Sequence, residues 1–113
     1  MDAKLFDINT LKNQINLAKN KNLIIGFTNG CFDLLHEGHI SLLSNSKKFC
    51  DYLIVGLNSD NSVKILKGKS RPIDKEKIRV KKLSVRPEID AVIIFYEETP
   101  LNLISELIPD VLI

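Results

Sequence analysis

The sequence predicts an α/β domain with a doubly wound parallel sheet. Short segments that are apolar throughout alternate with segments of helical periodicity. Strands without polar alternation are typical of parallel sheets that helices cover on both faces. The chain has 113 residues, of which 44% are hydrophobic and 27% charged, as in an ordinary globular protein. We therefore expect a single domain over 1–113, with an N-terminal helix within 1–21 and a parallel α/β core over 22–113.

The expected elements alternate as such a sheet requires. Four apolar segments are expected to be strands, at 22–28, 52–57, 91–96 and 110–113. Helices are expected at 8–20, 38–49, 75–83 and 99–107, with a further short helix after the second strand. Because connections between parallel strands cross over in the right-handed sense, the helices should fall on both faces of the sheet.

The helices also have expected caps and an expected inward face. Asp74 is expected to cap the helix at 75–83, and Thr99 the helix at 99–107. In the helix at 38–49, the spacing predicts that Ile40, Leu42 and Leu43 face the core.

The sequence predicts neither a membrane protein nor a secreted one. No apolar run approaches the ~18 residues that a membrane span needs. The N-terminus has no basic region followed by an apolar one, so we expect no secretion signal and a cytoplasmic location. Cys31 and Cys50 are too few for a disulfide framework or a zinc site, and we expect reduced thiols.

The C-terminus lies inside an apolar segment. No polar tail follows it, and no further helix follows to cover one face of the sheet. We therefore expect that the domain is truncated at its C-terminus, or that a partner chain supplies the cover.

Positive charge is concentrated in one stretch of the chain. Residues 61–82 contain nine Lys and Arg residues against two acidic residues, although the net charge of the whole chain is only +2. Such a stretch favours a nucleic acid or a phosphate ligand, or else forms a solvated helix face. It contains no aromatic residue on which bases could stack, so we expect no nucleic-acid partner.

The segment at 28–39, TNGCFDLLHEGH, joins the first expected strand to a helix. It matches neither GxxxxGK[ST] nor GxGxxG. His36 and His39 are three residues apart, so at a helix start their rings can lie on one face and meet one anion there. Gly30 allows close approach of the backbone to a ligand, and Gly38 carries no side chain that would block a phosphate.

This segment resembles the T-x-G-x-F-D-x-x-H-x-G-H signature of the cytidylyltransferase-like nucleotidyltransferases. The segments DYLIVGLNSD, LKGKSRPI and FYEETPLNLISELIPDVLI are similar to the D-glycero-β-D-manno-heptose 1-phosphate adenylyltransferase domain of bacterial ADP-heptose synthase. The likeness runs over 23–113. It implies a Rossmann-like fold and the transfer of AMP from ATP to heptose 1-phosphate. The products would be pyrophosphate and ADP-heptose, a precursor of the lipopolysaccharide core.

The resemblance also implies roles for particular residues. By the family motif, His36 and His39 hold the α-phosphate and the leaving oxygens, and Lys67 contacts the triphosphate. Arg71 and Arg79 are expected to meet phosphate or sugar phosphate. Mg²⁺ is expected to accompany the triphosphate, held mostly by phosphate oxygens and water, and no protein ligands are expected for it. A homodimer is also expected from the family.

The remaining site candidates have structural alternatives. Thr28, Asn29, Phe32, Gly30 and Gly38 are expected to line the nucleotide, although the first three can instead only shape the turn.

Two further candidates follow the second expected strand. Asn58 and Asp60 contact the ligand or simply cap the next helix. Asp33 is expected to orient the loop rather than to take part in the chemistry.

The sequence also departs from the family pattern. Lys77-Ile78-Arg79 stands where the family has Glu-Gln-Arg, and the family continues beyond the fourth strand with segments that help to bind the nucleotide. Two alternatives to the adenylyltransferase therefore stay open. One is a glycerol-phosphate-type cytidylyltransferase that uses CTP, and the other is a non-catalytic, truncated nucleotide-binding module.

Overall fold

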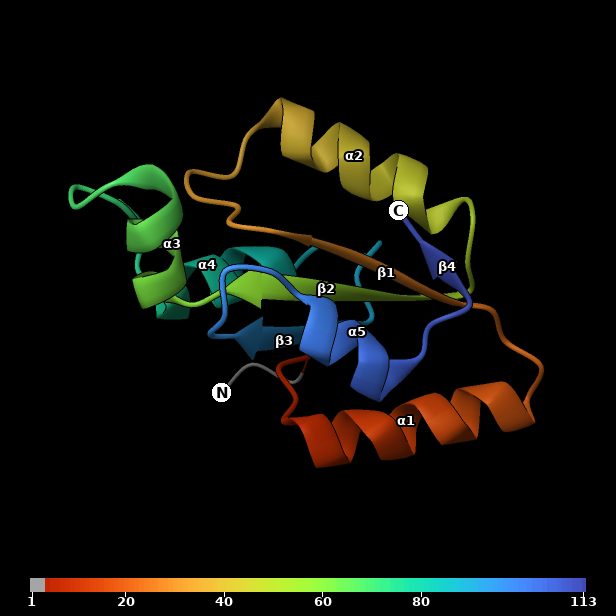
Figure 1. Cartoon of the computed structure of the whole chain (residues 1–113). Coiled ribbons are helices and arrows are strands. Elements are labelled where there is room, and N and C mark those ends of the chain that lie inside the picture. Colours follow the sequence, from red (N-terminus) through yellow and green to blue (C-terminus); the bar gives the residue numbers. More distant parts are fainter. Residues whose placement is uncertain (1–3) are drawn as a thin grey trace.

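Four parallel strands form one sheet in the order β3-β2-β1-β4 in the computed structural model, which describes residues 4–113 (Figure 1). The strands are β1 (Ile25–Gly30), β2 (Tyr52–Asn58), β3 (Ala91–Phe95) and β4 (Val111–Leu112). β2 pairs with β1 and with β3, and β4 pairs with β1 on its other side. The carboxyl ends of β1, β2 and β3 therefore meet at one edge. The predicted parallel α/β fold is confirmed.

Helices cover both faces of this sheet. They are α1 (Ile8–Asn20), α2 (Glu37–Lys47), α3 (Asp60–Lys67), α4 (Glu76–Ser84) and α5 (Leu101–Leu107). α1 and α5 pack on one face, and α2 and α4 on the other, each pair with its own core cluster. α3 follows the carboxyl end of β2 and lies beyond the sheet. No helix within 4–113 has the length and apolar character needed to cross a bilayer.

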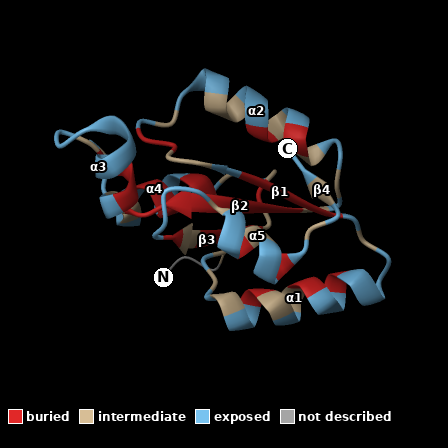
Figure 2. Ribbon diagram, viewed as in Figure 1, coloured by how far each residue is buried: buried red, intermediate tan, exposed pale blue. Residues whose placement is uncertain are grey.

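The strands alternate their side chains between the two core clusters. In β2, Ile54 packs towards α1 and α5, whereas Leu53 and Val55 pack towards α2 and α4. All three are fully buried, and Figure 2 shows the central strands as the most buried part of the fold. Burial of such side chains stabilises a fold by roughly 1.5–3 kcal/mol each, before the entropic cost of ordering the chain. The sheet is therefore a rigid platform for the loops at its carboxyl edge.

The segment before α1 covers the outer edge of β3. The Phe6 N–H donates to the Val92 carbonyl at 3.0 Å, and the Val92 N–H donates to the Lys4 carbonyl at 2.8 Å. This pairing satisfies backbone groups that an edge strand would otherwise expose. The sequence contains no signal for it, because it joins residues that are far apart in the chain.

Several predicted details are wrong, for physical reasons. Asp74 does not cap α4, because the N-cap is Lys75 and the Asp74 carboxylate accepts from Lys82 Nζ at 2.6 Å. α5 begins after Pro100 with no side-chain cap, so Thr99 does not cap it. Leu42 was expected to face the core but is 41% exposed, because α2 presents Leu43 to the sheet instead.

Candidate active site

A cavity of about 570 Å³ lies where β1, β2 and β3 end. Ligands of parallel α/β sheets bind at this edge. The cavity is lined by the loop after β1, by the end of β2, by the segment from the end of α3 to Arg71, and by Glu98 after β3. The lining residues are Asn29, Gly30, Cys31, Phe32, Asp33, Leu34, His36, His39, Asn58, Leu66, Lys67, Arg71 and Glu98.

A second cavity, of about 640 Å³, lies between the start of α1, the end of β3 and α5. Its charged lining residues are Asp7, Glu97 and Glu106, with no Lys, Arg or His. Like charges disfavour a phosphate there. The cavity with the two histidines therefore suits a phosphate better than this one does, although it is the smaller of the two.

The two histidine rings form the cap of α2. His36 is the N-cap, and its Nδ1 accepts from the Gly38 N–H at 3.1 Å. His39 Nδ1 in turn accepts from the His36 N–H at 3.2 Å. The rings stack with centroids 3.8 Å apart and planes 22° apart. Because each Nδ1 accepts a hydrogen bond, the neutral rings carry their proton on Nε2, which leaves two Nε2–H donors for a ligand.

The surroundings of His39 favour the neutral form of its ring. Burial lowers the pKa of His39, and the closeness of the His36 ring and of the Lys67 ammonium lowers it further. Phe32 packs edge-on against the same ring, with centroids 5.2 Å apart. The helix N-terminus supplies N–H groups and a positive dipole end to the same region. The arrangement suits an anion that needs neutral, oriented hydrogen-bond donors.

The two glycines of this segment make room for its aromatic side chains. A Cβ on Gly38 would lie 2.9 Å from Cε1 of His36, and a Cβ on Gly30 would lie 3.0 Å from the Phe32 ring. Gly38 does not line the cavity. It was expected to leave space for a phosphate, but in the structure it leaves space for the His36 imidazole.

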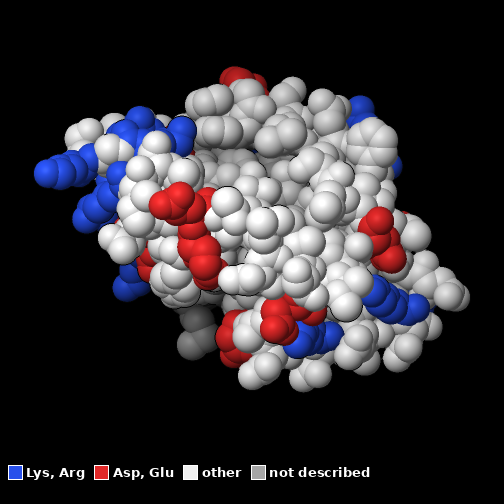
Figure 3. Space-filling view, viewed as in Figure 1, with Lys and Arg blue, Asp and Glu red and all other residues white. Residues whose placement is uncertain are grey.

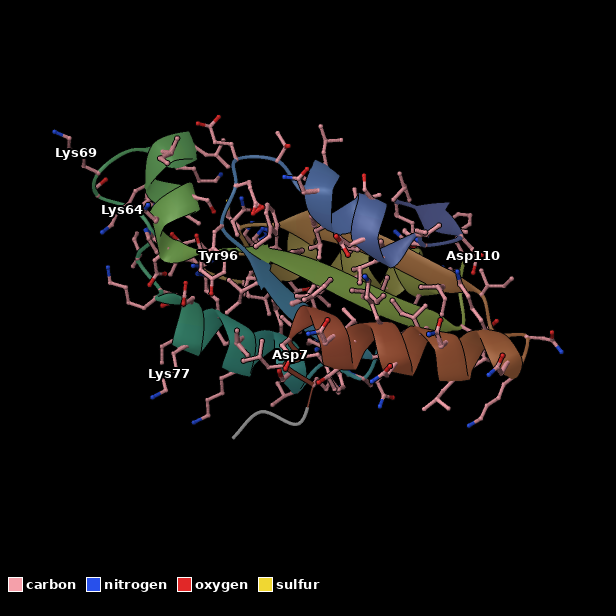
Figure 4. All side chains as sticks on the ribbon, turned by 60° about the horizontal axis from the view of Figure 1, so that its bottom comes forward. Asp7, Lys64, Lys69, Lys77, Tyr96 and Asp110 are labelled. Atoms are coloured by element: carbon pink, nitrogen blue, oxygen red, sulfur yellow. The ribbon has the colours of Figure 1, made fainter. Side chains whose placement is uncertain are left out.

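Two cationic side chains of the basic stretch, Lys67 and Arg71, also line the cavity. Lys67 is the last residue of α3, and Arg71 lies in the loop that follows. Figure 3 shows Lys and Arg side chains gathered around α3, with acidic side chains on the neighbouring surface. Lys64, Lys69 and Lys77 point outwards into solvent (Figure 4). The basic stretch is therefore divided: some of its cations line the cavity and others form a solvated surface.

Arg79 lies beneath the cavity and does not line it. Its side chain is fully buried, and four of its N–H groups are bonded to protein. Nη1 donates to the carbonyls of Cys31 and Asn58 at 2.9 and 2.7 Å, Nη2 to the Asp60 carboxylate at 2.8 Å, and Nε to the Asp74 carbonyl at 2.9 Å. We expected this guanidinium to meet phosphate. The structure instead uses it to tie the loops of the site together.

Asp60 and Thr28 also differ from expectation. The Asp60 carboxylate accepts from the Glu76 N–H at 2.7 Å as well as from Arg79, and it does not line the cavity. Thr28 is buried within β1, behind the cavity lining. These two residues support the elements around the site and do not face a ligand.

The structure thus brings together most of the residues that sequence reasoning selected. The selected residues that line the cavity are Asn29, Gly30, Phe32, His36, His39, Asn58, Lys67 and Arg71. Sequence reasoning did not assign Cys31, Leu34, Leu66 or Glu98 to the site. Glu98 lies three residues after the end of β3, and its place near a carboxyl strand end was the available signal.

No group of three or more metal-ligating side chains gathers anywhere in the described part of the chain. Of the two carboxylates that line the cavity, Asp33 accepts three hydrogen bonds from protein. The donor set therefore fits a Mg²⁺ ion held mainly by phosphate oxygens and water.

Comparison with known proteins identifies a matching family model and similar relatives. The family model "Cytidylyltransferase-like" matches residues 27–113. The chain is 48% identical over 112 residues to the bifunctional protein HldE of Rhodospirillum rubrum, covering 99% of this chain and 23% of that protein. It is 56% identical over 93 residues to HldE of Caulobacter vibrioides, covering 82% of this chain and 19% of that protein. The chain thus spans less than a quarter of the length of these curated relatives.

A solved structure is also similar. The crystal structure of the lipopolysaccharide core biosynthesis protein from Thermoplasma volcanium superposes with a TM-score of 0.71 at 34% identity. The match covers 80% of this chain and 72% of that one. The family model, the sequence relatives and the solved structure all point to the same family. This chain belongs to the cytidylyltransferase-like family of nucleotidyltransferases.

Proposed function

We propose that the chain transfers AMP from ATP to a heptose 1-phosphate, forming ADP-heptose and releasing pyrophosphate. An oxygen of the sugar phosphate attacks the α-phosphorus, and the bond from that phosphorus to the oxygen bridging to the β-phosphate breaks. The sequence likeness to heptose 1-phosphate adenylyltransferase domains supports this acceptor, as does the similarity to a lipopolysaccharide core biosynthesis protein. The location proposed for this reaction is the cytoplasm.

The observation that carries the proposal is the His36–His39 pair, which shares one cavity with Lys67 and Arg71. In phosphoryl and nucleotidyl transfer, the protein mainly positions the reactants and stabilises charge. The two Nε2–H donors bind the α-phosphate and the leaving oxygen. Lys67 and Arg71 offset the negative charge that builds up on the departing pyrophosphate. Mg²⁺ carried by the triphosphate would supply further charge neutralisation.

The test is release of pyrophosphate by the purified 113-residue chain with Mg²⁺ and heptose 1-phosphate, with ATP or CTP as the nucleotide. ATP should be consumed faster than CTP. Equal rates or a preference for CTP would contradict the heptose assignment and favour a cytidylyltransferase. Release of pyrophosphate from CTP with glycerol phosphate would then test that alternative. Binding of nucleotide without turnover would identify a non-catalytic module.

His39→Ala should lower turnover by roughly 100–1000-fold, the usual effect of losing one such donor. Ser41→Ala, in the same helix, is the control and should leave the rate unchanged. An unchanged rate in His39→Ala would contradict the proposed mechanism.

The homodimer expected from the family stays a prediction. Light scattering of the purified chain tests it.

A further inference from the structure

Asp33 connects two segments that are far apart in the sequence. Its side chain is only 1% exposed, although it lies in the loop that lines the cavity. Oδ2 accepts from Arg71 Nε at 2.7 Å and from the Ile73 N–H at 2.8 Å, and Oδ1 accepts from the Asp74 N–H at 2.8 Å. All three donors belong to the loop between α3 and α4.

The carboxylate is held in its charged form. Burial by itself would raise the pKa of Asp33, but the N–H groups of Asp74 and Ile73 and the Arg71 guanidinium outweigh burial and lower the pKa to about 2. A charged acceptor makes stronger hydrogen bonds than a neutral one. The carboxylate therefore stays charged, and able to accept all three bonds, at neutral pH.

The backbone around Asp33 is held in an uncommon conformation. Phe32 has φ 48° and Leu34 has φ 59°, both in the left-handed region that bulky residues rarely adopt. Such conformations persist only where surrounding contacts hold them, and they are concentrated at functional sites. Here the surrounding contacts include the three hydrogen bonds that Asp33 accepts.

The first part of the loop that Asp33 holds, 68–70, is exposed, whereas its later residue Asp74 is also bonded to Arg79 and Lys82. Gly68, at the end of α3, has φ 109°, and an added Cβ there would meet no atom within 4 Å. Lys69 projects from the loop into solvent (Figure 4). Of the side-chain nitrogens of Arg71, only Nε is bonded to protein within 4–113, so the terminal nitrogens stay available at the cavity. Without Asp33, the Arg71 side chain would lose its protein partner, and the N–H groups of Ile73 and Asp74 would lose their acceptor.

We propose that Asp33 is a positioning residue of the transfer reaction, which acts by holding Arg71 and its loop against the phosphate-binding cavity. This proposal rests on the proposed function for the identity of the ligand. Asp33 donates no proton and need not touch a substrate. It makes the cationic wall of the site rigid before a nucleotide arrives, which avoids the cost of ordering that wall on binding.

The test compares Asp33→Asn with a matched control. Asn has the same shape, but its amide cannot accept from all three donors, so at least one loop N–H loses its partner. We expect kcat/KM to fall about 100-fold, as for a misplaced catalytic group, and the amides of Ile73 and Asp74 to exchange hydrogen faster. Asp110→Asn is the control, because Asp110 also accepts a backbone N–H, that of Ile25, but at the opposite edge of the sheet. It should leave kcat/KM unchanged.

A double variant separates positioning from simple stability. If Asp33 acts through Arg71, adding Asp33→Asn to Arg71→Ala costs far less than Asp33→Asn costs alone. If instead Asp33→Asn lowers kcat/KM by the same factor with and without Arg71→Ala, the proposal is overturned. Unchanged KM and kcat in Asp33→Asn would overturn it as well. If the wild-type chain binds Mg-ATP but shows no turnover, the proposed function fails. Calorimetric titration then decides the positioning proposal: weaker binding by Asp33→Asn supports it, and equal binding overturns it.

Discussion

The two ring nitrogens of His39 have different roles. Its Nδ1 accepts the His36 N–H and so holds the start of α2, while its Nε2 is left for a ligand. A proton on Nδ1 would break the first contact and add charge to an environment that already lowers the pKa of this group.

The pH dependence follows from that lowered pKa. We expect kcat/KM to be flat above pH 6.5 and to fall at lower pH, as His39 is protonated. Because the unfolded chain takes up this proton first, near pH 6.5, the contribution of His39 to stability also declines as the pH falls below 6.5. Pyrophosphate release and urea unfolding between pH 5 and 8 measure both effects. A rate that rises as the pH falls would contradict the assignment of neutral donors.

Gly38 is a second residue whose role can be isolated. Replacing Gly by Ala in a helix normally stabilises it by up to about 1 kcal/mol. In Gly38→Ala, however, the new Cβ would press on the His36 ring, 2.9 Å away. We therefore expect turnover to fall by tenfold or more, an energy of about 1.4 kcal/mol in the barrier, without loss of thermal stability. Turnover equal to wild type would show that the ring has room to move.

At the scale of single elements, α4 is anchored from its inner side. It has no side-chain cap, and Arg79 bonds it to the loop after β1, to the end of β2 and to Asp60 at the start of α3. A buried Arg with this many partners is costly to remove, because the groups it leaves behind lose their hydrogen bonds.

Arg79→Ala should therefore lower the free energy of unfolding by about 3 kcal/mol or more. Turnover should fall as well, because the loops that carry the site residues lose their common partner. Lys77→Ala, on the exposed side of the same helix, should change stability by less than about 0.5 kcal/mol. Chemical unfolding of the two variants checks this, and similar stabilities for both would disprove the structural role of Arg79.

For the molecule as a whole, the buried Asp33 and the partly buried Glu88 contribute to the response to acid. Asp33 and Glu88 both have a pKa of about 2, below their ordinary values of 3.8 and 4.5. For Glu88 the cause is chiefly the hydrogen bond from Arg86, and Ser44 Oγ donates as well, at 2.8 Å. A lowered folded-state pKa stabilises the protein above the unfolded value, and the benefit is lost as the pH falls towards 2.

Comparison of Glu88→Gln with wild type isolates one of these contributions. The difference in unfolding free energy should be constant above pH 5 and should shrink between about pH 4.5 and 2. Urea unfolding at several pH values measures it. A difference that does not change over that interval would show that the Arg86–Glu88 pair contributes nothing to acid stability.

Much of the fold could be predicted because its signals are local. Runs such as 52–57 and 91–96 are apolar without alternation, and the spacing of His36 and His39 places both rings at one helix start. Chain order then puts the carboxyl strand ends, and with them the cavity, at one edge. Each of these inferences needs only residues that are neighbours in the sequence.

The role of each cation, in contrast, was decided by tertiary structure. Arg79 and Arg71 are both members of the same basic stretch, and no local feature tells them apart. Arg79 is buried because the Asn58 and Cys31 carbonyls and the Asp60 carboxylate converge on it from elsewhere in the chain, whereas Arg71 is held at the cavity by Asp33. Burial of a charge depends on partners that are brought together only when the chain folds. The sequence by itself therefore determined the sheet and the histidine pair. Only the folded chain decided which charges face the ligand.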